Sequence, residues 1–178
     1  MNKILVISDT HNNLKYQELA INKVPDANLI IHLGDNYDDA EDLINQGYQV
    51  IRVPGVWCPD YSNEAVDNRK IFVIDGWHFF ISHTKTSHEY DLAKDLKPEE
   101  TLKKNEIDVF LYGHTHIPEL NKENSIIICN PGHLKSIWEK GYSPSFAVIT
   151  TSENELKIQI RELLEEKIIT EAIFKKEI

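Results

Sequence analysis

Short apolar runs alternate with amphipathic stretches along the first half of the chain. Apolar runs of this length predict strands, and the amphipathic stretches between them predict helices that pack against a sheet as βαβ units. The predicted strands of this half cover residues 3–8, 29–33 and 49–53, and the predicted helices cover residues 14–23 and 38–46. Gly47 follows the second helix and is expected to close it as a C-terminal cap.

The second half of the chain has a different pattern, in which strands follow one another more directly. Residues 71–74 and 77–82 flank Asp75-Gly76, a dipeptide that favours a tight turn between antiparallel strands. Pro98 and the two acidic residues after it predict the start of a helix. Further strands are predicted at residues 109–112, 126–130, 146–150 and 156–161. We therefore expect a second sheet, although periodicity alone does not choose two sheets over one.

Polar signatures stand directly behind four of the apolar runs. They are Asp9-Thr10-His11, Gly34-Asp35, His83 and Gly113-His114-Thr115-His116. Open α/β sheets place their ligand sites at the carboxyl ends of strands. Carboxylates and imidazoles together form a mixed oxygen and nitrogen donor set that suits divalent transition metals. The pattern therefore predicts a site for two metal ions.

Each signature alone has a simpler interpretation. Asp9 could cap a helix with His11 as an incidental surface residue, Asp35 could be a turn aspartate, and the tandem histidines could be two half-exposed imidazoles. Metal ligation is favoured because the four signatures occur together, each behind a predicted strand. The remaining polar residues after the second strand are interpreted as cap and turn positions, namely Asn36, Asp38 and Asp39.

The order Asp-x-His, Gly-Asp, His, Gly-His-x-His resembles the calcineurin-like metallophosphoesterases, in particular their small single-domain prokaryotic phosphodiesterase branch. The resemblance runs from Lys3 to about Thr151 and includes Asn130-Pro131-Gly132. It implies an α/β fold, a four-layer αββα sandwich of two mixed sheets flanked by helices, with the metal site at one end. It also implies a hydrolase that acts on phosphodiesters. Phosphomonoesters or nucleotides remain an alternative, because no separate cap domain defines a substrate pocket.

The resemblance also implies a ligand set for two ions. Metal one would be held by Asp9, His11, Asp35 and His116, and metal two by Asp35, His83 and His114. Asp35 would bridge the ions, because a carboxylate has two oxygens. Two ions about 3.5–4 Å apart would generate a bridging hydroxide near neutral pH and clamp the phosphoryl oxygens. Mn²⁺ is the expected metal, with Ni²⁺, Zn²⁺, Fe²⁺ or Mg²⁺ as alternatives.

The chain departs from the family pattern in the loop Pro54-Gly55-Val56-Trp57-Cys58-Pro59-Asp60. The family has an asparagine ligand after the glycine, and Val56 cannot ligate a metal. Either metal two is bound more weakly, or water, Cys58 or Asp60 supplies the missing ligand, which makes Cys58 and Asp60 the candidate catalytic residues of this loop. A free cysteine and a solvated aspartate are the simpler interpretations. A metal-binding or interaction module with weakened catalysis is therefore an alternative function.

Two further residues are candidates for contact with the substrate. Trp57, with Tyr61 nearby, could form an apolar wall that stacks on an aromatic leaving group or a base, or it could cover the edge of the sandwich. His133 follows the Asn-Pro-Gly loop where the family usually has serine, and it could face the site without being a ligand. His32 and His78 lie inside predicted strands, where a satisfied core or surface imidazole is expected.

Length and composition set the remaining expectations. A chain of 178 residues fits a single domain, with residues 163–178 as a C-terminal extension of different composition. The formal net charge of −10 and a pI near 5.2 argue against stable partnership with nucleic acid or an anionic membrane. The expected partner is a small phosphoester substrate, and a homo-oligomer remains open.

Cysteine usage and the start of the chain indicate the compartment. Two cysteines cannot form a disulfide framework, and the start lacks the features of a signal peptide. No apolar run approaches the ~20 residues that a membrane helix needs. The expected location is the reducing cytoplasm.

Overall fold

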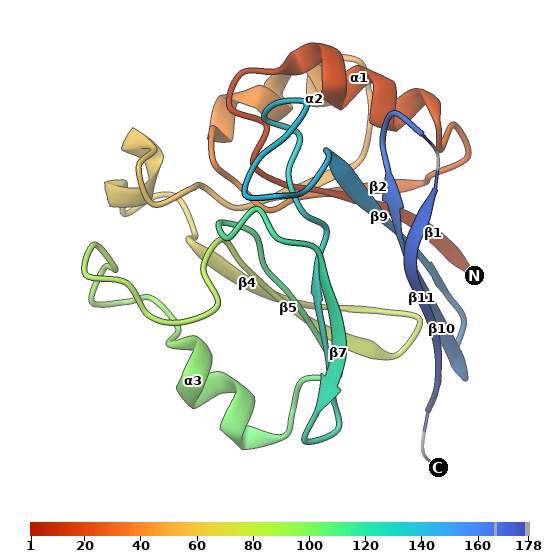
Figure 1. The fold of residues 1–178 in the computed structure, drawn as a ribbon. Helices are drawn as coiled ribbons and strands as arrows, with labels where there is room; N and C mark the ends of the chain where they lie inside the picture. Colours follow the sequence, from red (N-terminus) through yellow and green to blue (C-terminus); the bar gives the residue numbers. More distant parts are fainter. Residues whose placement is uncertain (166, 177–178) are drawn as a thin grey trace.

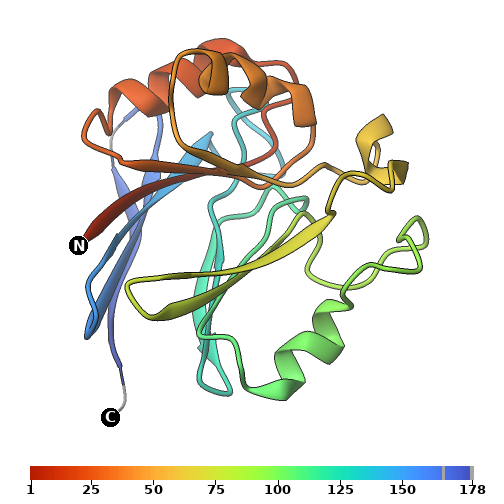
Figure 2. The ribbon, with the colours of Figure 1, turned by 180° about the vertical axis from the view of Figure 1, so that it is seen from behind.

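The computed structural model describes residues 1–165 and 167–176. Its strands form two sheets that pack face to face, and helices lie on the outer surfaces of this pair (Figures 1 and 2). Both sheets contain parallel and antiparallel neighbours. The expected α/β sandwich of two mixed sheets flanked by helices is therefore confirmed.

The first sheet has six strands. Three of them are parallel, and they are β1 (Asn2–Ile7), β2 (Leu29–His32) and β3 (Val50–Arg52). The others extend the sheet beyond β1 as antiparallel strands, and they are β9 (Ser145–Thr151), β10 (Glu155–Glu162) and β11 (Ile168–Lys175). The order across the sheet is β11-β10-β9-β1-β2-β3.

The second sheet has five strands. Its strands are β4 (Arg69–Ile74), β5 (Trp77–Ser82), β6 (Val109–Leu111), β7 (Glu119–Glu123) and β8 (Ile126–Asn130). Their order is β4-β5-β6-β8-β7, with β5, β6 and β8 parallel to one another. Asp75 and Gly76 connect β4 to β5 with φ angles of 48° and 79°, which is the left-handed geometry that a tight hairpin requires.

Short helices cover the outer faces of the sheets. The first sheet carries α1 (Leu14–Asn22), the 3₁₀ helix η1 (Tyr37–Ala40) and α2 (Glu41–Asn45), while η2 (Pro59–Ser62), α3 (Pro98–Thr101) and η3 (Leu102–Lys104) lie in the middle of the chain. Figure 1 shows α1 and α2 on one side of the sandwich and α3 on the other. No helix among the described residues is long and apolar enough to cross a membrane.

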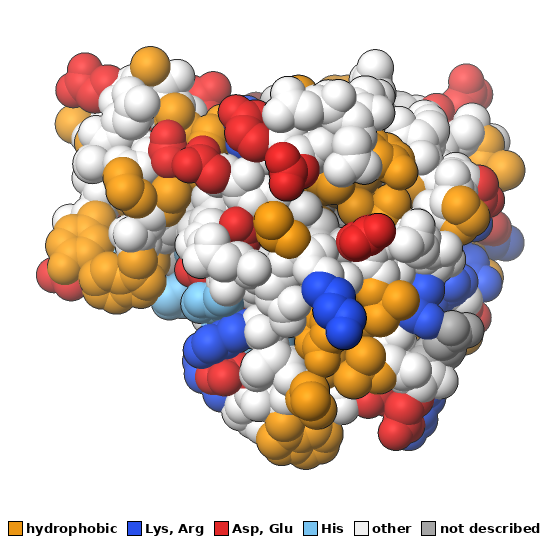
Figure 3. All heavy atoms as spheres, turned by 90° about the horizontal axis from the view of Figure 1, so that it is seen from above, with side chains coloured by type: hydrophobic (Ala, Val, Ile, Leu, Met, Phe, Trp, Pro, Cys, Tyr) orange, Lys and Arg blue, Asp and Glu red, His pale blue; other side chains and the backbone are white. Residues whose placement is uncertain are grey.

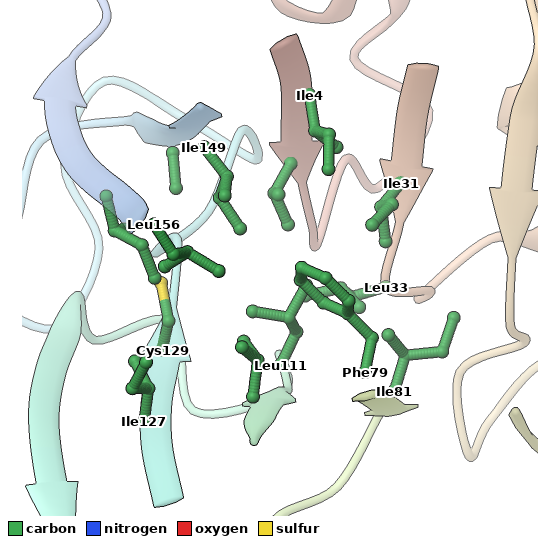
Figure 4. Packing of buried hydrophobic residues seen from close by; sticks show 14 of the residues in the cluster. Ile4, Ile31, Leu33, Phe79, Ile81, Leu111, Ile127, Cys129, Ile149 and Leu156 are labelled. Atoms are coloured by element: carbon green, nitrogen blue, oxygen red, sulfur yellow. The ribbon is translucent and has the colours of Figure 1, made fainter. Parts of the chain in front are cut away.

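The core is layered because the central strands are buried on both faces. On β1, Ile4 and Val6 point between the sheets, whereas Leu5 and Ile7 point toward the helices. A strand buried on both faces reads as a continuous apolar run, which is why the sequence predicted it clearly. Figure 4 shows the layer between the sheets, where side chains of both sheets meet, among them Ile4, Ile31, Leu33, Phe79, Leu111 and Cys129.

The structure differs from the predicted elements in one helix and two strands. The single helix expected at residues 38–46 is divided into η1 and α2, and Gly47 follows it with a φ of 90°. The strands β7 and β11 were not predicted. The sequence of β7 is polar, and β11 alternates between exposed and half-buried positions at the sheet edge, so neither produces an apolar run. Residues 168–175 of the predicted C-terminal extension pair with β10 in the first sheet.

The strand directions bring the carboxyl ends of the parallel strands to one end of the sandwich. The loops that follow β1, β2 and β3 in the first sheet therefore meet the loops that follow β5 and β6 in the second. Hydrogen bonds join the two sets directly, since His114 N donates to Asp9 Oδ2 at 2.9 Å and His83 Nδ1 donates to Leu33 O at 2.8 Å. All the predicted metal ligands lie on these loops.

The inter-sheet core predicts a large stability cost for truncating Phe79. This side chain is fully buried, and its ring stacks against Phe72 with 5.6 Å between centroids. Phe79→Ala should lower the free energy of unfolding by about 3–5 kcal/mol, measured by urea denaturation, because it removes apolar contacts and leaves a cavity. The control is Ile71→Ala on the neighbouring strand, where the side chain is half exposed and the cost should stay under about 1 kcal/mol. Equal losses in the free energy of unfolding of the two variants would contradict the burial of Phe79 between the sheets.

Candidate metal centre

The structure brings the six predicted metal ligands together. Ligand atoms of Asp9, His11 and His116 lie within 4.8 Å of one another, as do those of Asp9, Asp35 and His83. The sixth residue, His114, joins the second group because its Nδ1 lies 3.2 Å from His83 Nε2. Asp9 belongs to both groups, and Asp35 Oδ2 lies 2.7 Å from His11 Nδ1. Two carboxylates therefore stand between the two sets of imidazoles.

The distances between the donor atoms fit bound cations. His11 Nε2 lies 3.2 Å from His116 Nε2, which lies 3.3 Å from Asp9 Oδ1. Two imidazole nitrogens that face each other repel through their lone pairs unless a proton or a cation lies between them. Atoms that each lie about 2.0–2.2 Å from one ion are roughly 3 Å from one another. The donor set and its spacing therefore suit a divalent ion in each group.

The backbone is left-handed at five of the six ligands. The φ angles are 53° at Asp9, 47° at His11, 82° at Asp35, 66° at His114 and 63° at His116. A residue other than glycine in this region typically costs on the order of 1–3 kcal/mol, and such residues persist only where the surrounding structure holds them. Strained residues cluster at functional sites, and here the strain coincides with the predicted ligands.

Two glycines allow the ligand loops to approach one another. A Cβ at Gly113 would collide with Ser8 Oγ and lie 2.8 Å from Asp9 Oδ2. A Cβ at Gly55 would lie 2.5 Å from the Cα of Asp35, and Gly55 N donates to Asp35 O at 3.1 Å. Only a residue without a side chain permits these contacts.

Hydrogen bonds orient the ligands on both sides of the site. Asp9 Oδ2 accepts from Ser8 Oγ at 2.6 Å and from the backbone N–H of His114 at 2.9 Å. The other carboxylate oxygen, Oδ1, is the one near His116. His83 Nδ1 lies 2.8 Å from the carbonyl oxygen of Leu33 and donates to it, since a carbonyl can only accept. This bond leaves the lone pair of His83 Nε2 for the site.

The electrostatics of the site favour the protonation states that ligands need. Burial raises the pKa of Asp9, but the hydrogen bond with His116 and the charges of His83 and His116 outweigh it and lower the pKa to about 2. Burial lowers the pKa of His114, and the nearby charge of His83 lowers it further. The carboxylate is thus held ionised and the imidazole neutral, as metal ligation requires.

Asp39 has a larger role than the cap or turn position assigned to it from the sequence. Its Oδ2 accepts from Thr10 Oγ1 at 2.5 Å and from Asn12 N at 2.9 Å, so it fixes the loop that carries Asp9. His32 lies beneath the same loop, with Nε2 3.3 Å from Thr10 Oγ1 and Nδ1 accepting from Gly34 N at 3.2 Å. Burial lowers the pKa of His32 to about 4, so this histidine is a neutral, satisfied core residue.

Cys58 and Asp60 are paired with each other. Cys58 Sγ donates to Asp60 Oδ2 at 3.2 Å, and burial raises the pKa of the thiol, so the thiolate is disfavoured. Neither residue belongs to a group of converging ligand atoms in the part of the chain that the structure describes. Val56, the residue in the place of the expected asparagine, is buried.

The two candidate substrate residues have different surroundings. Trp57 is exposed, and its neighbours are His88 and Tyr90 and not Tyr61, which is buried and donates from its hydroxyl to Asp91 Oδ1. His133 is fully buried, with its ring centroid 5.5 Å from that of His116 and its Nε2 3.2 Å from Tyr142 O. His133 therefore packs behind the predicted ligand His116, while Trp57 faces solvent.

Comparison with known proteins adds a family to this geometry. A family model described as calcineurin-like phosphoesterase superfamily domain matches residues 2–154. A probable metallophosphoesterase from Mycoplasma genitalium is 30% identical over 163 residues, which cover 88% of this chain and 91% of that protein. A phosphodiesterase from Methanocaldococcus jannaschii is 27% identical over 174 residues, and the match covers 87% of this chain and 96% of that protein. The solved structure of an E. coli phosphoesterase has the same fold, with a TM-score of 0.70 at 21% identity, 96% of this chain and 98% of that chain being covered.

The contact of Gly113 with the first ligand loop predicts a metal-binding defect. Gly113→Ala should weaken Mn²⁺ binding by roughly tenfold or more, measured by calorimetry, because the added methyl displaces Ser8 and the Asp9 carboxylate that it orients. Gly47→Ala is the control, since nothing lies within 4 Å of its added Cβ although its φ of 90° makes the substitution strained. A folded Gly113→Ala protein with unchanged Mn²⁺ affinity would contradict the role of this contact.

Proposed function

The chain belongs to the calcineurin-like phosphoesterase superfamily, and on this basis we propose that it is a metal-dependent hydrolase of phosphodiesters. The observation that carries the proposal is the convergence of six ligand residues on loops from both sheets, five of them with a left-handed backbone. These six are Asp9, His11, Asp35, His83, His114 and His116. We propose that they hold two divalent ions, with Mn²⁺ the first metal to test.

The surroundings of each site residue indicate what it would contribute to hydrolysis. Two bound divalent ions would supply positive charge for the phosphoryl oxygens and lower the pKa of a water molecule. Asp9 and Asp35 supply negative charge between the two sets of imidazoles, and Ser8 and Leu33 hold Asp9 and His83 in orientation. No side chain of the chain needs to form a covalent intermediate in this scheme.

Two observations support a phosphodiester over a phosphomonoester. The archaeal relative is named a phosphodiesterase. In addition, the loop after β3, whose Gly55 contacts the backbone of Asp35, carries the apolar residues Val56 and Trp57 where the family has an amide. A diester carries one negative charge and two organic groups, so it needs fewer polar donors than a doubly charged monoester and tolerates apolar neighbours.

Val56 also supports the competing function of a metal-binding or interaction module. An amide ligand is missing on one side of the site, and Cys58 is engaged with Asp60 and held as the neutral thiol. If no other group compensates, one ion is held by fewer ligands than the other. Catalysis by the pair would then be weakened even though the ligands converge.

We expect hydrolysis of bis(p-nitrophenyl) phosphate to require added metal and to depend on Asp35. The protein is stripped of metal, and release of p-nitrophenolate is measured after Mn²⁺, Ni²⁺, Zn²⁺ or Mg²⁺ is added. Asp35→Asn should lower the rate by roughly a hundredfold or more, because removing even a residue that only orients a ligand typically costs roughly 10–100-fold.

Asp38→Asn is the matched control, because Asp38 is an exposed carboxylate three positions further along the chain, in η1. A faster metal-dependent rate with p-nitrophenyl phosphate would favour the monoesterase. Tight metal binding without turnover of either ester would favour the binding module.

We expect the two ions to be retained unequally because Val56 provides no donor atom. Dialysis against a mild chelator should leave roughly one ion per chain by elemental analysis. Val56→Asn should move the content toward two ions and raise diesterase activity on the order of tenfold, because the amide oxygen can ligate and the NH₂ can donate to the transition state.

Val56→Ala is the control for a change of volume without a new donor, and it should restore neither the second ion nor the rate. Equal retention of two ions by the natural chain would refute the inequality. A folded, two-metal Val56→Asn protein without increased activity would show that the loop does not limit catalysis.

A further inference from the structure

An exposed cluster of rings lies beside the candidate metal centre. This aromatic cluster consists of Trp57, His88 and Tyr90. The Trp57 ring lies 5.4 Å from Tyr90 and 5.9 Å from His88 between centroids, in edge-on contacts. Trp57 is 67% exposed and Tyr90 48% exposed, so the rings contact one another while much of their surface faces solvent. Large exposed aromatic groups that gather in one place are typical of ligand-binding surfaces.

The aromatic cluster adjoins the metal centre directly. The His88 ring centroid lies 6.5 Å from that of the predicted ligand His114, so the rings continue outward from the ligand set. Figure 3 shows histidine side chains at the surface with hydrophobic side chains beside them on the same face. A substrate whose phosphate binds at the ligands would extend an attached group over this cluster.

Asp91 links the two segments that carry the rings and also pairs with the buried Arg69 of β4. Both oxygens of Asp91 accept from Arg69 Nη2 at 2.9 Å, and Asp91 also accepts from Tyr61 Oη at 2.5 Å and from His88 N at 3.0 Å. Arg69 and Tyr61 are buried. Tyr61 belongs to η2, which follows Trp57 closely, whereas Asp91 belongs to the loop of His88 and Tyr90, so the hydrogen bond between Tyr61 and Asp91 holds the rings near one another before a ligand binds. Such preorganisation lowers the entropic cost of binding.

The position of Trp57 is also fixed relative to the ligands. Gly55 N donates to Asp35 O at 3.1 Å, and Cys58 N donates to Gly55 O at 2.9 Å, so Trp57 stands inside a turn whose start is bonded to a ligand residue. These bonds therefore fix the backbone at Trp57 relative to Asp35.

We propose that the aromatic cluster is a stacking subsite for a planar aromatic group, such as the base of a nucleoside, carried by the organic part of the phosphoester whose phosphate binds at the metal centre. The inference rests on the proposed function, because the phosphate must lie at the six ligands for the group to reach the rings. Stacking on an aromatic ring does not depend on the identity of the base. The net charge of −10 favours a single small ester over a polynucleotide.

The first test measures binding at equilibrium, without turnover. Calorimetry of the Mn²⁺-loaded protein compares adenosine 5′-monophosphate with ribose 5-phosphate, which lacks the base. The natural chain should bind the adenosine compound roughly tenfold more tightly, a difference within the range of one base–aromatic stack. Trp57→Leu should abolish this preference, and Trp57→Phe should retain part of it. Trp138→Leu is the matched control, because Trp138 is exposed to a similar degree, 64%, and should leave the preference unchanged.

The second test measures hydrolysis of two diesters that differ only in the base. Adenosine 5′-(methyl phosphate) and ribose 5-(methyl phosphate) release the same methanol, so the chemical step is the same. The KM of the natural chain should be roughly tenfold lower for the adenosine ester, with similar kcat, because stacking stabilises substrate and transition state equally. Trp57→Leu should raise the KM of the adenosine ester alone.

The outcomes separate this inference from the proposed function. Hydrolysis of both diesters with equal KM, unchanged in Trp57→Leu, would overturn the subsite while leaving the phosphodiesterase intact. A Trp57-dependent preference for adenosine 5′-monophosphate without hydrolysis of either diester would support the subsite and refute the activity. Equal loss of the preference in Trp57→Leu and Trp138→Leu, with both proteins folded by circular dichroism, would overturn the subsite.

Discussion

The left-handed backbone at five of the six predicted ligand positions is the constraint on which the rest of the site depends. Each such residue is less stable there than in an extended or helical conformation, and no single loop supplies enough contacts to hold it. The two sheets do so together, because their packed core fixes the strands from which the loops emerge. Hydrogen bonds such as that from His83 to the carbonyl of Leu33 then cross from one sheet to the other. Ligand geometry is therefore a property of the whole sandwich.

Two carboxylates outside the predicted ligand set hold loops in place around the candidate metal centre. Asp39 binds the loop that carries Asp9, and Asp91 binds the loops that carry the aromatic cluster. Neither belongs to a converging group of ligand atoms among the described residues. In both cases a charge accepts several hydrogen bonds from segments distant in sequence, which is how a buried carboxylate is stabilised. The hydrogen bonds of Asp39 thus support the loop at the proposed phosphate site, and those of Asp91 separately support the aromatic cluster.

The sequence predicted the elements that depend on residues close together in the chain. Strands β1 and β2 form apolar runs because both faces are buried, and the ligand motifs stand out because they follow such runs. It could not predict β7, whose polar residues lie at a sheet edge, or the pairing of β11 with β10. The roles of Asp39 and Asp91 were also inaccessible, since their partners lie up to 29 and 30 positions away and no periodic pattern connects them.

The close approach of Gly55 to Asp35 has a consequence for how this loop can change. Because no side chain fits between the two backbones, the path of the chain at this point is closed to variation. Trp57 extends into solvent and is under no such restriction, whereas Val56 is buried and can be replaced by side chains of similar volume. The metal donor at position 56 and the substrate contact at position 57 can therefore change while the backbone of this loop keeps its path. A library confined to these two positions would sample new specificities on an unchanged scaffold.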